Sequence, residues 1–136
     1  MKEEDYPCRE TTEVVIASAF EVSNTLGCGF LEKVYENALA AELRYRGLQV
    51  ATQVPIQVLY RKQSVGCYQA DMIVGKSVLV EVKATEAHHD IFVAQTLNYL
   101  RATGIPVGLL LNFGQPKLRY KRLAMSPPKP SVLPES

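Results

Sequence analysis

The sequence predicts a single α/β domain in which a mixed β-sheet is flanked by helices. Its 136 residues are enough for one hydrophobic core and too few for two. Apolar residues recur at three- and four-residue steps in three stretches, as on one face of an amphipathic helix. Other segments are short runs rich in Val, Ile and Leu, which are typical of strands. The predicted order is two helices, three strands, one helix and two strands.

Two helices open the predicted domain. The first is expected at Thr12–Leu26 and the second at Phe30–Arg46, with Gly47 as its C-cap. Gly27-Cys28-Gly29 separates them. A glycine-rich turn before a helix can cradle a phosphate, but this turn follows a helix and lacks the lysine of a P-loop. We therefore interpret the glycines as the bend between two helices.

The second predicted helix carries a carboxylate among its apolar positions. At about 100° per residue, Glu32 falls between Leu39 and Leu43 on the apolar arc, and Glu36 lies at its border. Glu32 is either a functional carboxylate or a first-turn acid that interacts with the helix dipole and the free backbone amides. The helix pattern leaves both interpretations open.

Three strands are expected next. Leu48–Tyr60 is strand-like, and Pro55 within it indicates an edge position or a bulge. After a polar turn, Val65 leads into a second strand that includes Gln69–Val74. The third strand is predicted at Ser77–Ala84.

A strand–helix–strand unit is expected to follow. Thr85 or Asp90 can cap its helix, which runs to Thr103. Val107–Phe113 is almost wholly apolar, as in a strand that is buried on both faces. We expect this strand to run parallel to Ser77–Ala84 after a right-handed crossover.

The last predicted strand, Lys117–Leu123, is expected at a sheet edge and has a basic face. This face could contact a phosphate backbone, or its charges could protect a solvated edge. The basic residues are Lys117, Arg119 and Lys121.

Three charged residues lie among the apolar residues of the central strands. Glu81 and Lys83 are two residues apart and therefore point to the same face of their strand. Asp71 lies opposite Glu81 if the connection is Gly75-Lys76-Ser77 or contains a bulge, whereas a two-residue turn would place it opposite Val80. We expect the three-residue connection, because it gathers the three charges.

These buried charges are costly unless they pair with each other or bind a ligand. One interpretation is an ion pair of Lys83 with Glu81 or Asp71 that fastens a strand. The other is a site for a hard divalent cation, beside which Lys83 could hold a water molecule or stabilise charge on a phosphate. Gln95, on the next helix, could orient the lysine, the water or the phosphate. Such a set predicts metal-assisted hydrolysis of a phosphodiester bond.

Several separated motifs resemble those of one known family. Gly29–Tyr35 reads G-F-L-E-K-V-Y, and the segments V-P-I, Y-x-A-D, V-E-V-K-A, A-Q-x-L-N-Y-L and G-L-L-L-N-F-G follow in order. From Thr12 to Leu123, the chain resembles the GxxExxY proteins, a family of small bacterial proteins. This family is similar to the PD-(D/E)XK nuclease superfamily, so the resemblance implies a restriction-endonuclease-like core.

The resemblance also implies roles for single residues. The implied metal ligands are Asp71, Glu81 and Glu32, which would bind Mg²⁺ or Mn²⁺. Asp71 and Glu81 would form the catalytic core with Lys83, and Gln95 would position the reacting groups.

Further implied roles concern the substrate. Tyr99 completes a Q-x-x-x-Y element with Gln95, and the basic face of the last strand is expected to contact substrate through Lys117, Arg119 and Lys121. Two departures from the family pattern are Ala70, in place of the proline before the aspartate, and Ile91-Phe92-Val93, in place of a more polar stretch.

Composition and charge narrow the class of protein. The net charge of +1 argues against a protein that coats nucleic acid by charge alone. Three cysteines without a C-x-x-C motif do not form a disulfide framework. The sequence shows no apolar run of transmembrane length and no signal peptide, so we expect a cytoplasmic protein without a membrane partner. We expect an N-terminal extension at residues 1–11, the domain at 12–123, and a disordered proline-rich tail at 124–136.

The sequence therefore predicts a metal-dependent nuclease that acts on DNA or RNA. The alternative is a module that binds nucleic acid or protein without catalysis and retains the nuclease fold. A homodimer is the expectation for double-strand cleavage, although no residue of the sequence demonstrates it.

Overall fold

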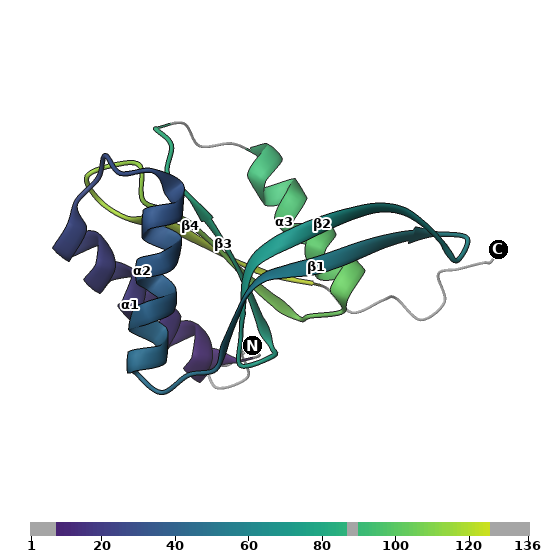
Figure 1. Cartoon of the computed structure of the whole chain (residues 1–136), viewed down its shortest axis with the longest axis horizontal. Helices are drawn as coiled ribbons and strands as arrows, with labels where there is room; N and C mark the ends of the chain where they lie inside the picture. The colour runs from purple at the N-terminus through teal and green to yellow at the C-terminus, as the bar shows by residue number, and fades with distance from the viewer. Residues whose placement is uncertain (1–7, 87–89, 126–136) are drawn as a thin grey trace.

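The computed structural model describes residues 8–86 and 90–125, which form a five-stranded sheet with helices on both sides. Figure 1 shows α1 and α2 together on one side, and α3 beside the long hairpin of β1 and β2. The strands lie in the order β1-β2-β3-β4-β5. The elements are α1 (Arg9–Leu26), α2 (Glu32–Tyr45), β1 (Val50–Tyr60), β2 (Gln63–Val74), β3 (Val78–Lys83), α3 (Asp90–Thr103), β4 (Val107–Asn112) and β5 (Arg119–Ala124).

The centre of the sheet is a parallel pair. β3 and β4 run parallel, with Val78 opposite Val107 and Lys83 opposite Asn112, and α3 connects them along the chain. The other neighbouring strands are antiparallel. The predicted strand–helix–strand unit is confirmed, and β5 is the predicted edge strand. This topology places Glu81 and Lys83 at the carboxyl end of β3, where open α/β sheets commonly bind ligands.

Two apolar clusters cover the two faces of the sheet. Val15 of α1, Leu39 of α2 and Leu111 of β4 belong to the larger cluster and are fully buried. Leu79 of β3 and Leu100 of α3 belong to the smaller cluster on the opposite face. Burial of large aliphatic side chains, at about 25 cal/mol per Å² of apolar surface, fixes both helical layers against the sheet.

Tyr35 fixes the bend between α1 and α2. Its hydroxyl group donates to the Gly27 carbonyl oxygen at 2.6 Å and accepts from the Phe30 amide at 3.2 Å. Its ring is fully buried and stacks on Phe113 at a centroid distance of 4.8 Å. Gly27 and Gly29 both have positive φ angles, of 72° and 115°, which side chains rarely adopt. The glycines therefore make the interhelical bend, as predicted, and Tyr35 holds it.

The connection between β2 and β3 has three residues. Val74 pairs with Val78, and Met72 pairs with Val80, so 75–77 form the turn. This confirms the predicted connection. The same register, continued by one residue, sets Asp71 opposite Glu81.

The β1–β2 hairpin is kinked beside Asp71, so that its inner and outer parts pack against different helices. Met72 belongs to the cluster under α1 and α2, whereas Ala70 belongs to the cluster under α3. On a regular strand these two residues would share a face. Across from Asp71, Gln53 has a positive φ of 51°, and the β1–β2 pairing skips from Thr52 to Val54. A local kink in both strands therefore turns the outer part of the hairpin toward α3.

The ends of the domain differ slightly from expectation. α1 begins at Arg9, so residues 9–11 belong to the first helix rather than to an extension. Thr12 is polar but buried, so the spacing of apolar residues does not reveal the first turn of α1. β5 includes Ala124, so this residue belongs to the sheet and not to the predicted tail. The part of the predicted tail from residue 126 onward lies outside the described residues. No helix in the described ranges is both long enough and apolar enough to span a membrane.

Candidate active site

Asp71 and Glu81 face each other across β2 and β3 and bond to each other's strand. The Asp71 amide donates to Glu81 Oε2 at 3.0 Å, and the Val82 amide donates to Asp71 Oδ2 at 2.7 Å. The regular β2–β3 ladder stops one residue earlier, at Met72 and Val80. The carboxylates therefore take the place of the carbonyl acceptors that a continued ladder would supply. Each is held through a single oxygen, and no hydrogen bond within the described chain engages Asp71 Oδ1 or Glu81 Oε1.

This pair carries an excess of negative charge. Burial, followed by the neighbouring Asp71 carboxylate, raises the pKa of Glu81 to about 8. Burial also raises the pKa of Asp71, and the carboxylates of Glu36 and Glu32 add to the effect. The backbone amides and the Lys83 ammonium lower both pKa values but do not cancel the rise. The site therefore favours a proton or a cation between the two carboxylates.

Lys83 lies on the same face as Glu81 but forms no ion pair among the described residues. Its Nζ atom lies 4.6 Å from the centroid of the Phe92 ring, in a cation–π contact. Phe92 belongs to the segment of α3 that departs from the family pattern, and here it holds the lysine. The interpretation of Lys83 as one partner of a strand-fastening ion pair therefore has no support in this geometry.

Glu36 is a site residue that the sequence analysis placed only at the border of the helix face. Glu36 is 4% exposed, and its carboxylate accepts from Gln53 Nε2 at 2.5 Å and from Lys33 Nζ at 3.3 Å. Among charged groups it has the largest effect on the pKa of Asp71. In the sequence, Glu36 could be found only from its position one turn after Glu32. Its hydrogen bond depends on the kink in β1, which brings the Gln53 side chain to it.

Glu32 is the first residue of α2 and is exposed, so the expected helix carboxylate lies at the rim of the site. It raises the pKa values of both Asp71 and Glu81, which places its charge near the pair. No hydrogen bond or ion pair within the described residues engages its carboxylate. The Glu32 carboxylate is therefore available to a ligand, whereas the Glu36 carboxylate is bonded through both of its oxygens.

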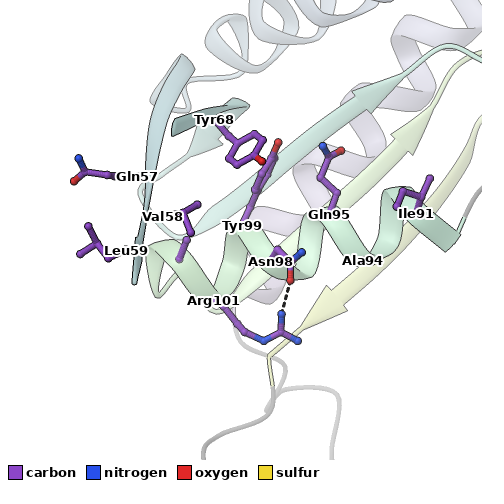
Figure 2. A pocket seen from close by; sticks show the side chains of 11 residues that line it. Gln57, Val58, Leu59, Tyr68, Ile91, Ala94, Gln95, Asn98, Tyr99 and Arg101 are labelled. Carbon is purple, nitrogen blue, oxygen red and sulfur yellow. Dashed lines mark hydrogen bonds between the residues drawn. The ribbon is translucent and has the colours of Figure 1, made fainter. Parts of the chain in front are cut away.

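Gln95 and Tyr99 lie one turn apart on α3, in the wall of a pocket of about 740 Å³. Figure 2 shows both side chains on the inner face of the helix, with the Tyr99 ring next to Tyr68 of β2. Burial raises the pKa of Tyr99, and the Glu81 carboxylate is the next cause. Tyr99 therefore lies within range of the Glu81 charge, and the role of the Q-x-x-x-Y element stays a prediction.

The three basic residues of the last segment separate in the structure. Arg119 and Lys121 line a hollow of about 230 Å³ together with Lys83 and Asn112. Lys117 precedes β5 and lines another hollow beside α1, which Arg119 also lines. The basic strand therefore brings two of the three candidate substrate contacts to the lysine side of the site.

The donor set suits a hard divalent cation. Mg²⁺ and Mn²⁺ prefer carboxylate and water oxygens, and a Mg²⁺ site commonly uses only one or two carboxylates with several waters. The open oxygens of Asp71 and Glu81, with Glu32 at the rim, match this pattern. Across the described ranges, no three His, Cys, Asp or Glu side chains converge into a complete cage. The site therefore fits an ion that retains water ligands.

This fold and this pair of carboxylates beside a lysine define a nuclease-like protein. Residues 9–123 match the model of the PD-(D/E)XK nuclease superfamily, and the chain belongs to that superfamily. Its members generally use divalent metal ions. No curated protein sequence matches the chain significantly.

The solved structures that resemble the chain include the following two. The crystal structure of SSO0001 has 17% sequence identity and a TM-score of 0.51, with 86% of this chain and 58% of that chain covered. An alkaline exonuclease, LHK-Exo, from Laribacter hongkongensis has 13% identity and a TM-score of 0.51, with 93% of this chain and 73% of that chain covered. The chain thus spans 58% of the length of SSO0001. The likeness confirms the restriction-endonuclease-like fold.

Proposed function

We propose that the protein hydrolyses phosphodiester bonds in DNA or RNA with the help of Mg²⁺ or Mn²⁺. The observation that carries this proposal is the Asp71–Glu81 pair, in which each carboxylate keeps one oxygen free beside the Lys83 ammonium. Asp71 and Glu81 would hold the cation, and Glu32 would assist at the rim. Membership of the nuclease superfamily supports the same assignment.

The bound cation would polarise a phosphate oxygen and lower the pKa of a water ligand. The chain's own residues complete the chemistry. Lys83 would hold the attacking water or stabilise negative charge on the scissile phosphate, since its ammonium is not neutralised by a carboxylate partner in the described chain. Gln95 would orient the phosphate or the water from α3, and Arg119 and Lys121 would contact flanking phosphates.

We also propose that the chain belongs to the GxxExxY branch of the superfamily. Gly29 has a φ of 115° and Tyr35 anchors the bend through its hydroxyl group, so the glycine and the tyrosine of the motif fix the start of α2. Glu32, the acid between them, is then carried at the first position of this helix, next to the carboxylate pair. This division of roles supports assignment of the motif.

The test is cleavage of labelled single- and double-stranded DNA and RNA in Mg²⁺, Mn²⁺ or EDTA. Lys83→Ala is compared with Lys76→Ala, which removes the same charge from the exposed β2–β3 connection. We expect metal-dependent cleavage that Lys83→Ala abolishes and Lys76→Ala retains. Cleavage that survives in Lys83→Ala would place the activity elsewhere.

The second candidate is a module that binds nucleic acid or protein without catalysis and retains the nuclease fold, and the hollow lined by Lys83, Arg119 and Lys121 is the observation that favours it. It predicts no cleavage by folded protein in either metal, together with retained binding of nucleic acid. Binding to the same labelled substrates separates it from a nuclease.

A further inference from the structure

The pocket that contains Gln95 and Tyr99 extends away from the carboxylates, between α3 and the outer part of the β1–β2 hairpin. One wall is formed by Ala94, Asn98 and Arg101 of α3, and the other includes Val58 and Tyr68 of the hairpin. The kink at Gln53 and Asp71 creates this wall, because it turns the outer hairpin toward α3. Figure 2 shows the Tyr99 side chain projecting from α3 to lie next to the Tyr68 ring of the hairpin.

The pocket adjoins the candidate active site. Tyr99 lines it and belongs to the same apolar cluster as Ala70, the residue before Asp71, and Leu79, which lies two residues before Glu81 on β3. Gln95, one turn earlier on α3, lines the same wall. A chain-like ligand that lies in this pocket would therefore reach the carboxylates at one end.

The lining suits nucleobases. The rings of Tyr68 and Tyr99 lie 5.8 Å apart between centroids and are tilted by 41°, and Tyr68 is 51% exposed. Asn98 accepts from Arg101 Nη1 at 2.6 Å, which fixes both polar groups at the pocket wall. Among the described residues, no Asp or Glu lines the pocket, so none of them places a negative charge against a polyanion there.

Two cationic residues follow the hairpin end of the pocket along the chain. Leu59 lines it, and the hairpin turn at Arg61 and Lys62 begins two residues later. Both turn residues have positive φ angles, of 50° and 67°, a conformation that two-residue hairpins usually give to Asn and Gly. Arg61 also lies 5.9 Å from the Tyr60 ring centroid. The hairpin tip therefore has Arg61 and Lys62 in a backbone conformation that Asn and Gly adopt more easily.

We propose that this pocket binds an unpaired segment of a nucleic acid and guides it to the carboxylate pair, which rests on the proposed nuclease function. Bases would stack on Tyr68, and the phosphates would contact Arg101 and the cations at the hairpin tip. A duplex is a poorer occupant, because a wall with one arginine offers few contacts to two phosphate backbones and the rings favour exposed bases.

Fluorescence anisotropy in EDTA tests the pocket without catalysis, with a labelled single strand and the matching duplex as probes. We expect the single strand to bind more tightly, and Tyr68→Ala to weaken it by roughly five- to a hundred-fold, the range for loss of one stacked base. Tyr68→Phe should keep most of the affinity because it keeps the ring. Tyr45→Ala, at an exposed tyrosine of α2, is the matched control and should change affinity less than twofold.

Two results would overturn the proposal: tighter binding of the duplex, or single-strand binding that is unchanged in folded Tyr68→Ala. Cleavage that depends on Lys83 but not on Tyr68 would reject the pocket and leave the nuclease function standing. Binding that depends on Tyr68, without cleavage in Mg²⁺ or Mn²⁺, would support the pocket and reject the nuclease function.

Discussion

Gln53 donates its side-chain amide to the buried Glu36 carboxylate at 2.5 Å, from a strand position whose φ is +51°. The residue lies across β1 and β2 from Asp71, where the regular pairing is interrupted. Positive φ in a non-glycine residue costs of order 1 kcal/mol or more and persists where surrounding contacts hold it. The hydrogen bond to Glu36 is such a contact, and it links α2 to the strand kink beside the carboxylate pair.

Removal of this donor should destabilise the protein. Gln53→Ala leaves the Glu36 carboxylate buried without its shorter bond, and we expect a loss of about 1–3 kcal/mol in the free energy of unfolding. Urea unfolding measures it, with Gln57→Ala on the exposed face of β1 as the control. In the double variant with Glu36→Gln, the costs should be less than additive. Full additivity would mean that the two side chains do not depend on each other.

Stability without metal should fall as pH rises through the neutral range. The ordinary pKa of Glu81 is 4.5 and the folded protein raises it to about 8, so between these values the folded state binds more protons than the unfolded state. The free energy of unfolding must then decrease with pH, by an amount on the order of a few kcal/mol. Glu81→Gln stays neutral and should flatten the curve, so that it exceeds the wild type at pH 8.5 and matches it near pH 5.

Thermal unfolding in EDTA buffers across pH 5–9 measures this effect. Glu10→Gln, on an exposed position of α1, removes a carboxylate elsewhere and should leave the wild-type slope unchanged. A wild-type stability that rises from pH 5 to pH 8 would contradict the assigned charge balance.

Mn²⁺ should reverse the instability of the carboxylate pair. A ligand that binds only the folded state adds about 2.7 kcal/mol at 100 times its Kd. We expect the melting temperature to rise with Mn²⁺, more strongly at pH 8 than at pH 6, because protons compete for Glu81. Asp71→Asn should abolish the rise and EDTA should remove it. A rise of equal size in Asp71→Asn would show that the ion binds somewhere else.

Glu32 and Glu36 should respond differently to neutralisation. Glu32 is exposed at the helix start, so Glu32→Gln should weaken Mn²⁺ binding and leave stability without metal within about 0.5 kcal/mol. Glu36 is buried and bonded through both oxygens, so Glu36→Gln should mainly change stability. Isothermal titration with Mn²⁺, combined with urea unfolding, separates the two effects. The reverse pattern would make Glu36 the helix ligand.

Tyr35→Phe tests the anchor of the interhelical bend. The variant keeps the stacking on Phe113 but loses the bonds to Gly27 and Phe30, and we expect a loss of about 1–2 kcal/mol. Tyr45→Phe, at an 87% exposed ring, should be neutral within about 0.5 kcal/mol. Urea unfolding of both variants makes the comparison. Equal stability of Tyr35→Phe and the wild type would mean that the glycines alone set the bend.

The order of elements, the parallel strand–helix–strand unit and the three-residue connection that sets Asp71 opposite Glu81 were all predicted from the sequence. These features follow from local rules: periods of 3.6 and 2 along the chain, and a strand register set by the length of one connection. Asp71, Glu81 and Lys83 were identifiable because charges within apolar strands are costly wherever the strands pack.

The completion of the site depends on contacts between elements that are far apart in the sequence. Nothing local to Gln53 predicts its positive φ, and nothing local to Glu36 predicts a bond to a residue 17 positions away. The contact of Lys83 with Phe92 and the pocket between Tyr68 and Tyr99 likewise join separate elements. Such contacts depend on the angle at which a helix or hairpin packs on the sheet. That angle depends on the summed burial of many side chains, so no short segment of the sequence predicts it.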